Sequence, residues 1–276
     1  MKARPSRSRL NLRFARRAGR AFLSEGVFVY DRLVIKLQSR QVTPGSALAQ
    51  RRSSDWFVEL HHLLGAELPC TRCALFAAEI WPSIQRLTAP TTPRAGDRHD
   101  GDANLAQAVW SVTTHIKPDR VVETGVARGM TSAAILSAMM ANGSGHLYSI
   151  DLPALSDGWA EQTGAAVTPE LRARWTYVRG SARRRLPKLI RALGSIDFFV
   201  HDSLHTYDNM RFEFGLAWPA LRPGGVLIAD DIQDSRAFDE LVPAAPAPGS
   251  DGPRSWLVAD EVAKPSAAWG LVVKRS

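Results

Sequence analysis

Three aspartates follow two short apolar segments, and their type and spacing are suited to holding a metal ion. Asp202 comes directly after residues 196–201, and Asp230 and Asp231 come directly after residues 225–229. If the two segments are neighbouring parallel strands, the three carboxylates converge at one edge of a pocket. Carboxylates placed together raise one another's pKa unless a cation neutralises them. Because hard divalent cations take oxygen ligands and keep waters for a substrate, the cluster favours Mg²⁺.

A histidine lies three residues after the first of these aspartates. His205 can reach the same space, where it would act as a general base with a pKa near neutral. Asp202 and His205 are therefore the candidate catalytic residues. Structural roles stay open for the same side chains: a helix cap for Asp202, a loop hydrogen bond for His205, and turn positions for Asp230 and Asp231.

A loop of small residues follows the apolar segment 120–124. Gly125, Ala127 and Gly129 occupy alternate positions, in the pattern G-x-A-x-G. Small residues let a ligand approach the backbone closely, and the helix that follows presents free N–H groups. The spacing departs from the dinucleotide fingerprint G-x-G-x-x-G, which argues against NAD.

Two further segments end in residues that suit a nucleoside. Asp151 follows the apolar segment 146–150 and lies 26 positions beyond Gly125, where a carboxylate can accept both hydroxyls of a ribose. A helix cap or an ordinary loop acid is the alternative for Asp151. Ser181 and Ala182 form a small polar turn that can contact an adenine edge.

Alternating strands and helices must position these residues. We expect strands at 120–124, 146–150, 175–179, 196–201 and 225–229, and helices at 105–116, 131–141, 183–192 and 208–221. Short apolar runs separated by helical stretches predict a parallel sheet covered on both faces, and thus the α/β class. Residues 255–262 and 269–274 are close enough in sequence to pair as a terminal hairpin, which adds an antiparallel strand.

The positive charge of the chain is concentrated at its N-terminus. The 276 residues include 35 Lys and Arg against 27 Asp and Glu, a formal charge of +8. Residues 1–52 contain 13 of the basic residues and 2 of the acids, or +11, which leaves −3 for the other 224 residues. We expect a basic N-terminal arm over 1–52, partly disordered or helical and solvated. An arm that binds RNA or an anionic membrane surface, or one that acts as an organelle transit peptide, is the alternative.

Residues 53–101 are predicted to form a helical extension and linker before a domain over 102–276. Apolar residues recur at helical spacing in 56–64 and in 75–84, and residues 89–101 are rich in Pro, Gly and polar residues. Cys70 and Cys73 are the two cysteines of the chain, too few for a disulfide framework. We expect ordinary buried thiols, because a structural zinc needs four ligands and His61 and His62 complete no usual pattern. Metal or redox chemistry is the alternative.

In these motifs the chain resembles class I S-adenosylmethionine-dependent methyltransferases, from about residue 102 to residue 276. The segments occur in the order E-T-G-V-A-R-G, Y-S-I-D, V-R-G-S-A, I-D-F-F-V-H-D-S-L-H-T-Y and L-R-P-G-G-V-L-I-A-D-D. The last two are similar to segments of the metal-dependent O-methyltransferases of natural-product sugars, macrolides and catechols, and of the cephalosporin-hydroxylase-like group.

The resemblance implies a Rossmann-like, doubly wound sheet of seven strands, mostly parallel, with a C-terminal antiparallel strand. It implies S-adenosylmethionine as cofactor, with its methionine end, ribose and adenine near Glu123, Gly125, Ala127, Gly129, Asp151, Ser181, Ala182 and Asp202. It also implies metal ligands at Asp202, Asp230 and Asp231, with His205 as the base. Ala127 stands in place of the usual middle glycine, and Ser181 where many relatives carry an acid.

The expected activity is Mg²⁺-dependent O-methylation of a small hydroxylated acceptor, such as a sugar, a polyketide or a phenol. We expect a cytoplasmic protein with no membrane span, because no run approaches the roughly 18 apolar residues of a transmembrane helix. One alternative is a metal-independent N- or RNA methyltransferase that uses the basic arm, although no N-P-P-Y-type turn follows residues 196–201. Another is a non-catalytic cofactor-binding protein. Assembly as a homo-oligomer is left open.

Overall fold

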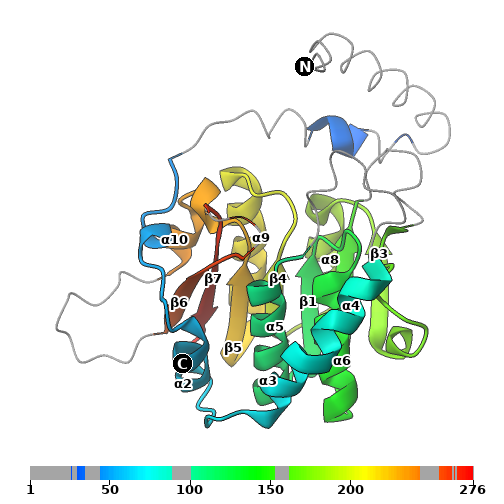
Figure 1. Cartoon of the computed structure of the whole chain (residues 1–276). Coiled ribbons are helices and arrows are strands. Elements are labelled where there is room, and N and C mark those ends of the chain that lie inside the picture. The colour runs from blue at the N-terminus through cyan, green and yellow to red at the C-terminus, as the bar shows by residue number, and fades with distance from the viewer. Residues whose placement is uncertain are drawn as a thin grey trace, which may run out of the picture.

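The computed structural model describes Gly26 and residues 30–34, 44–88, 101–152, 162–242, 255–262, 264 and 266–275. The described residues form one sheet in the order β3-β2-β1-β4-β5-β7-β6 (Figure 1). The strands are β1 (Arg120–Thr124), β2 (His146–Asp151), β3 (Trp175–Arg179), β4 (Ile196–His201), β5 (Leu221–Ala229), β6 (Trp256–Asp260) and β7 (Ala268–Val273). Strands β1 to β5 are parallel, and β7 pairs antiparallel with both β5 and β6. The predicted α/β class, the seven-stranded sheet and the terminal hairpin are confirmed.

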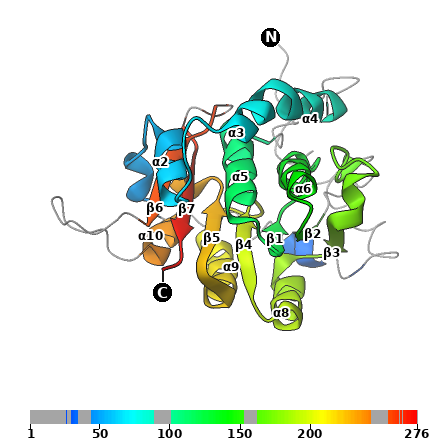
Figure 2. The ribbon, with the colours of Figure 1, turned by 90° about the horizontal axis from the view of Figure 1, so that it is seen from below.

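Helices cover both faces of the sheet, as Figure 2 shows. Helices α5 (Ala103–Ile116) and α6 (Met130–Asn142) lie on one face, and α8 (Ala182–Leu193), α9 (Tyr207–Ala220) and α10 (Ala237–Leu241) lie on the other. Side chains alternate between faces along a strand. Val121 therefore packs into the hydrophobic core beneath α5 and α6, and Val122 packs into the core beneath α8 and α9. Short 3-10 turns occur at Leu48–Gln50, Leu171–Arg174 and Ile232–Asp234.

Local chemistry explains where helix α5 begins and ends. The Asp102 carboxylate accepts hydrogen bonds from the backbone N–H groups of Asn104 and Leu105, which caps the N-terminus. At the other end Lys117 has a left-handed backbone with φ of 46° and precedes Pro118, so the helix stops there. The chain then enters β1, whose end carries the loop of small residues.

A helical segment precedes α5 in the described residues and packs into the same core as the sheet. It comprises α2 (Trp56–Leu63), α3 (Thr71–Leu75), a π-helical turn (Phe76–Ile80) and α4 (Trp81–Thr88). Trp56 on α2 meets Trp269 on β7 edge to face, with ring centroids 5.2 Å apart. The predicted linker lies outside the described residues, apart from Gly101.

Part of the predicted arm is packed rather than solvated. Ala49 is fully buried, and the backbone N–H of Ala47 donates to Asp239 on α10 at 2.6 Å. This part of the chain therefore differs from our expectation, because its backbone groups find partners on the domain. The rest of the predicted arm lies outside the described residues, apart from Gly26 and residues 30–34. Within the described ranges, no helix is both long enough and apolar enough to cross a membrane.

Candidate active site

A cavity of about 320 Å³ lies at the carboxyl ends of β1, β2 and β4. In doubly wound sheets, ligands bind at this edge, near the point where the strand order reverses. The cavity is lined by six of the residues predicted to bind the cofactor: Gly125, Ala127, Asp151, Ser181, Ala182 and Asp202. The structure therefore brings together residues that are spread over nearly eighty positions of the sequence.

Gly125 allows the ends of β1 and β4 to approach each other closely. A Cβ atom at this position would lie 1.8 Å from the carbonyl oxygen of Asp202. The backbone also has a φ of +88°, a conformation that other residues rarely adopt. Gly125 thus sets the position of Asp202 relative to the loop after β1, in addition to leaving space for a ligand.

Two of the predicted cofactor residues do not line the cavity. The carboxylate of Glu123 is fully buried and accepts hydrogen bonds from Ser132 and Ser149, both at 2.6 Å. Burial raises the pKa of Glu123 to about 7. Gly129 faces the backbone of Gly164, which a Cβ would approach to 2.9 Å. In this structure Glu123 joins β1, β2 and α6, so its predicted contact with the methionine end stays a prediction.

Asp151 is placed as predicted at the end of β2. Burial raises its pKa, while the positive charge of Arg32 opposes that rise. Its Oδ2 atom is buried and has no hydrogen-bond partner among the described residues. A buried carboxylate oxygen that lacks a donor is suited to accept one from a ligand hydroxyl.

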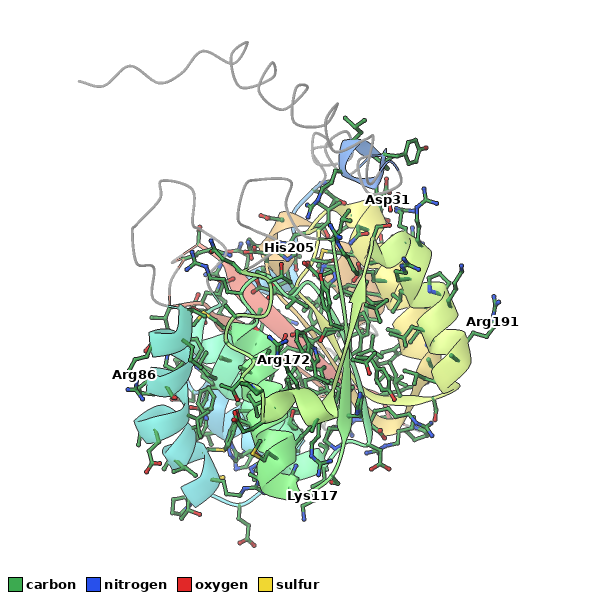
Figure 3. The ribbon with its side chains drawn as sticks, turned by 90° about the vertical axis from the view of Figure 1, so that its right-hand side faces the viewer. Asp31, Arg86, Lys117, Arg172, Arg191 and His205 are labelled. Carbon is green, nitrogen blue, oxygen red and sulfur yellow. The ribbon has the colours of Figure 1, made fainter. Side chains whose placement is uncertain are left out.

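One wall of the cavity comes from the N-terminal arm and was not predicted from the sequence. Asp31, on a helical turn at residues 30–34, accepts hydrogen bonds from Ser181 Oγ and from Arg184 Nε, both at 2.7 Å. Asp31 and Arg32 line the cavity, and Figure 3 shows Asp31 and His205 at the same end of the molecule. The only sequence signal was that Asp31 is one of the two acids in a basic arm.

Asp202, Asp230 and Asp231 lie near one another beside the cavity, but among the described residues no single group of mutually close ligand atoms includes all three. One ligand atom from each of Asp202, His205 and Asp230 lies within 4.8 Å of the others, and the same holds for Asp230, Asp231 and Glu261. Asp230 is common to both groups. His205 Nδ1 is 3.0 Å from Asp231 and its Nε2 is 3.8 Å from Asp202.

The close carboxylates shift one another's pKa. Burial raises the pKa of Asp202 to about 7, and the charges of Glu123 and Asp231 add to the rise. Burial and the charge of Asp202 raise the pKa of Asp230 to about 7 as well. Burial alone would raise the pKa of Asp231, but its hydrogen bond with His205 holds that pKa far below the usual range.

His205 differs from the near-neutral base that we expected. Burial lowers the pKa of its imidazole, but the Asp231 hydrogen bond and the charges of the surrounding carboxylates outweigh burial and raise the pKa to about 9. His205 is therefore an imidazolium at neutral pH when only the protein's own charges surround it. The sequence could not show this, because the shift depends on how Asp231 is turned toward the ring.

Two further charged residues of the cluster were not predicted. Lys264 Nζ lies 3.1 Å from Asp231 and 3.5 Å from Glu261. Burial and the charge of Asp230 raise the pKa of Glu261 to about 9. Both residues come from the segment between β6 and β7, whose sequence carries no motif that points to this site.

A buried carboxylate on α9 supports the loop that carries Asp202. Glu213 lies 2.7 Å from His201 Nδ1 and accepts a hydrogen bond of 2.8 Å from Ser203 Oγ. Burial would raise the pKa of Glu213, but the charge of His201 and these hydrogen bonds outweigh it and lower the pKa. The residues on both sides of Asp202 are thus anchored to one buried group.

Comparisons with known proteins agree with this geometry. Residues 122–232 match the model of a methyltransferase domain family. No curated protein sequence matches the chain. The structure resembles that of an O-methyltransferase from Bacillus cereus in complex with SAH, with 16% sequence identity and a TM-score of 0.52, over 74% of this chain and 97% of that chain. It also resembles TomG from Streptomyces achromogenes, an O-methyltransferase involved in tomaymycin synthesis, with 14% identity and a TM-score of 0.51, over 74% and 96%.

At these identities the solved structures establish the fold, and the family match adds the type of domain. The matched residues run from β1 to the turn after β5, and so include the glycine loop, Asp151 and the three aspartates of the cluster. The motifs, the sheet order and the family match agree with one another. Residues 122–232 match a methyltransferase domain family, and they lie on a fold shared with solved O-methyltransferases.

Proposed function

We propose that the chain is a class I S-adenosylmethionine-dependent methyltransferase that transfers a methyl group to a hydroxyl oxygen of a small acceptor, with Mg²⁺ bound at Asp202, Asp230 and Asp231. The observation that carries the proposal is a cluster of four carboxylates beside the cavity, formed with Glu261 and facing two cationic side chains, His205 and Lys264. Without a metal, burial and neighbouring negative charge raise the pKa of Asp202, Asp230 and Glu261, so these groups resist ionising together. With all four carboxylates ionised the cluster carries a charge of −2, which a divalent cation would balance.

The donor set supports a hard cation. Asp230 Oδ1, Glu261 Oε1 and His205 Nε2 are buried and lack a hydrogen-bond partner among the described residues. Leaving such a group unsatisfied costs about 1–3 kcal/mol, so a further partner at this point is expected. Carboxylate oxygens are the ligands that Mg²⁺ prefers. When bound, the ion would act as a Lewis acid that lowers the pKa of an acceptor hydroxyl.

The cavity beside this cluster has the features that a nucleoside cofactor needs. The unpartnered Oδ2 of Asp151 would accept the ribose hydroxyls, and Ser181 and Ala182 would lie along the adenine. Gly125 and Ala127 leave room for the methionine end. S-adenosylmethionine would supply a methyl group on a positively charged sulfur. Because Asp202 lines the cavity and also belongs to the cluster, the two sites adjoin at that residue.

His205 would remove the proton of the acceptor hydroxyl, and only its neutral form can do so. Its Nε2 lies on the Asp202 side of the ring, while Nδ1 is held by Asp231. The Asp231 carboxylate therefore orients the ring and stabilises its charge after proton transfer. The name O-methyltransferase, carried by both solved structures described above, supports oxygen as the acceptor atom.

The test is transfer of a labelled methyl group to a panel of sugars, phenols and polyketides, with Mg²⁺ or with a chelator. We expect turnover only with Mg²⁺, and we expect Asp202→Ala to lose it while still binding S-adenosylhomocysteine. Equal turnover in excess chelator would contradict the metal. Transfer to RNA or to amines, with none to any hydroxyl, would contradict the acceptor class.

A further inference from the structure

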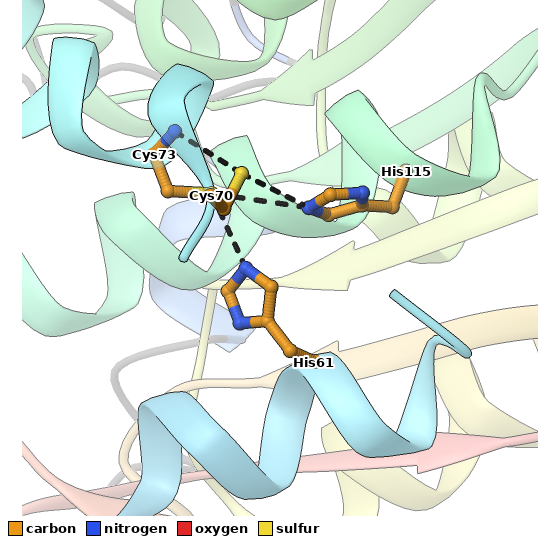
Figure 4. Close-up of side chains that lie close together, drawn as sticks. All are labelled: His61, Cys70, Cys73 and His115. Atoms are coloured by element: carbon orange, nitrogen blue, oxygen red, sulfur yellow. Dashed lines mark hydrogen bonds between the residues drawn. The ribbon is translucent and has the colours of Figure 1, made fainter. Parts of the chain in front are cut away.

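Two cysteines and two histidines from separate helical elements converge on one point, away from the cofactor cavity. His61 lies on α2, Cys70 and Cys73 lie at the start of α3, and His115 lies in the last turn of α5. One ligand atom from each residue lies within 4.8 Å of the other three. Figure 4 shows the four side chains pointing toward one another.

The distances between these atoms match those between ligands of a tetrahedral zinc ion. His61 Nε2 is 3.4 Å from Cys73 Sγ, and His115 Nε2 is 3.5 Å from Cys70 Sγ and 3.9 Å from Cys73 Sγ. With Zn–S bonds of about 2.3 Å and Zn–N bonds of about 2.0 Å, tetrahedral geometry places sulfur and nitrogen ligands about 3.5 Å apart. A C-x-x-C pair with two histidines is also a common ligand set for structural zinc.

The surroundings orient the ligands as a metal site requires. His61 Nδ1 lies 2.7 Å from the carbonyl oxygen of Phe57. A carbonyl can only accept a hydrogen bond, so Nδ1 carries the proton and the lone pair of Nε2 faces the thiols. Cys70 Sγ accepts a hydrogen bond from the backbone N–H of Cys73 at 3.4 Å, which stabilises a thiolate.

Charge and burial favour a metal over redox chemistry. Two thiolates cancel the charge of Zn²⁺, so the complex is neutral and suits a position where His61 is 0% and Cys73 2% exposed. Reactive redox cysteines lie in partially exposed surroundings, whereas buried structural cysteines are inert. Cys73 belongs to the buried kind.

We propose that His61, Cys70, Cys73 and His115 bind one structural zinc ion, which clamps the N-terminal helices onto α5. Four protein ligands leave no open position, which is typical of structural sites. His115 is two residues from Lys117, and Figure 3 shows Lys117 at the end of the molecule opposite Asp31 and His205. The zinc therefore holds α2, α3 and α5 together without touching the cavity.

The first test measures metal in the purified full-length protein after exhaustive dialysis. We expect about one zinc per chain, released when a mercurial reagent modifies the thiols. Cobalt loaded in its place should show the visible absorption of a tetrahedral Co²⁺ site with thiolate ligands. Zinc below about 0.1 per chain, or cobalt bound with only octahedral absorption, would overturn the proposal.

The second test compares two adjacent histidines on α2. His61→Gln should lower zinc affinity about tenfold or more, whereas His62→Gln should leave it unchanged because His62 is exposed and is not part of the cluster. Asp230→Asn, in the carboxylate cluster, should also keep its zinc. If His62→Gln lost zinc as His61→Gln does, the ligand assignment would be wrong. If a variant fails to fold, the cobalt spectrum of the unmodified protein still decides the question.

Discussion

Replacing Asp230 with Asn measures how much the ionisation of one buried carboxylate destabilises the fold. Asp230 is 6% exposed, and burial and the charge of Asp202 raise its pKa from 3.8 to about 7. Between these two values the folded protein holds a proton that the unfolded chain has lost, so stability falls as the pH rises. Integrated over this window, ionisation of Asp230 makes the fold about 2–3 kcal/mol less stable near pH 8 than near pH 5.

Asn has the same shape as Asp and cannot ionise, so the variant loses no stability through ionisation at this position. In chelator, the free energy of unfolding of Asp230→Asn minus that of the unmodified protein should be about 2–3 kcal/mol larger near pH 8 than near pH 5, which means that the variant is relatively more stable at pH 8. Urea unfolding followed by tryptophan fluorescence at both pH values measures the difference. Asp55→Asn is the control, because Asp55 is exposed and makes no side-chain capping bond. A stability difference for Asp230→Asn that is equal at the two pH values would refute the reasoning.

Three further predictions follow from single contacts. Gly125→Ala should destabilise the fold by about 3 kcal/mol or more in urea unfolding, because the new Cβ would clash with the loop after β4. Gly143→Ala is the control and should cost only about 1 kcal/mol, because Gly143 has φ of +74° but nothing lies within 4 Å of its Cβ. Equal losses of stability would contradict the close approach at Gly125. Asp31→Ala should weaken S-adenosylhomocysteine binding about tenfold, measured by calorimetry, because the helical turn that lines the cavity loses its hydrogen bonds. An unchanged Kd would argue that residues 30–34 do not form a wall of the binding site. Turnover with Mg²⁺ should rise with pH as the imidazolium of His205 loses its proton, at a pH below the pKa of about 9 that His205 has without a cation. A flat pH–rate profile, or a rise that His205→Gln keeps, would remove His205 as the base.

The sheet could be predicted because buried parallel strands leave a strong local signal. Strands β1, β3 and β4 have the predicted bounds, since each is a short apolar run with a polar or glycine residue after it. β5 begins at Leu221 rather than at residue 225, because Gly224 and Gly225 interrupt its apolar pattern although the backbone continues as a strand. Strand ends then identified the residues that line the cavity.

The rest of the site depends on contacts between segments far apart in sequence. Asp31 comes from the arm, and Glu261 and Lys264 come from the hairpin, yet all three meet residues at strand ends. No local spacing distinguishes them from ordinary surface charges. The pKa of His205 depends in the same way on Asp231, whose left-handed backbone has φ of 47°.

The cysteine pair is a second case in which sequence spacing alone could not identify every residue of a cluster. Cys70 and Cys73 have a recognisable spacing, but one of the two histidines beside them, His115, is on a helix that follows the linker. His61 and His62 are the histidines near the pair in sequence, but His62 is not part of the cluster, and nothing local points to His115. Only the packing of α5 against α3 places His115 beside the thiols.

The most direct test of the proposed chemistry is a calorimetric titration of Mg²⁺ into the protein saturated with S-adenosylhomocysteine. We predict one binding site, which Asp230→Asn loses while it still binds S-adenosylhomocysteine. No Mg²⁺ binding, or equal binding by Asp230→Asn, would contradict the assignment of the carboxylate cluster as the metal site.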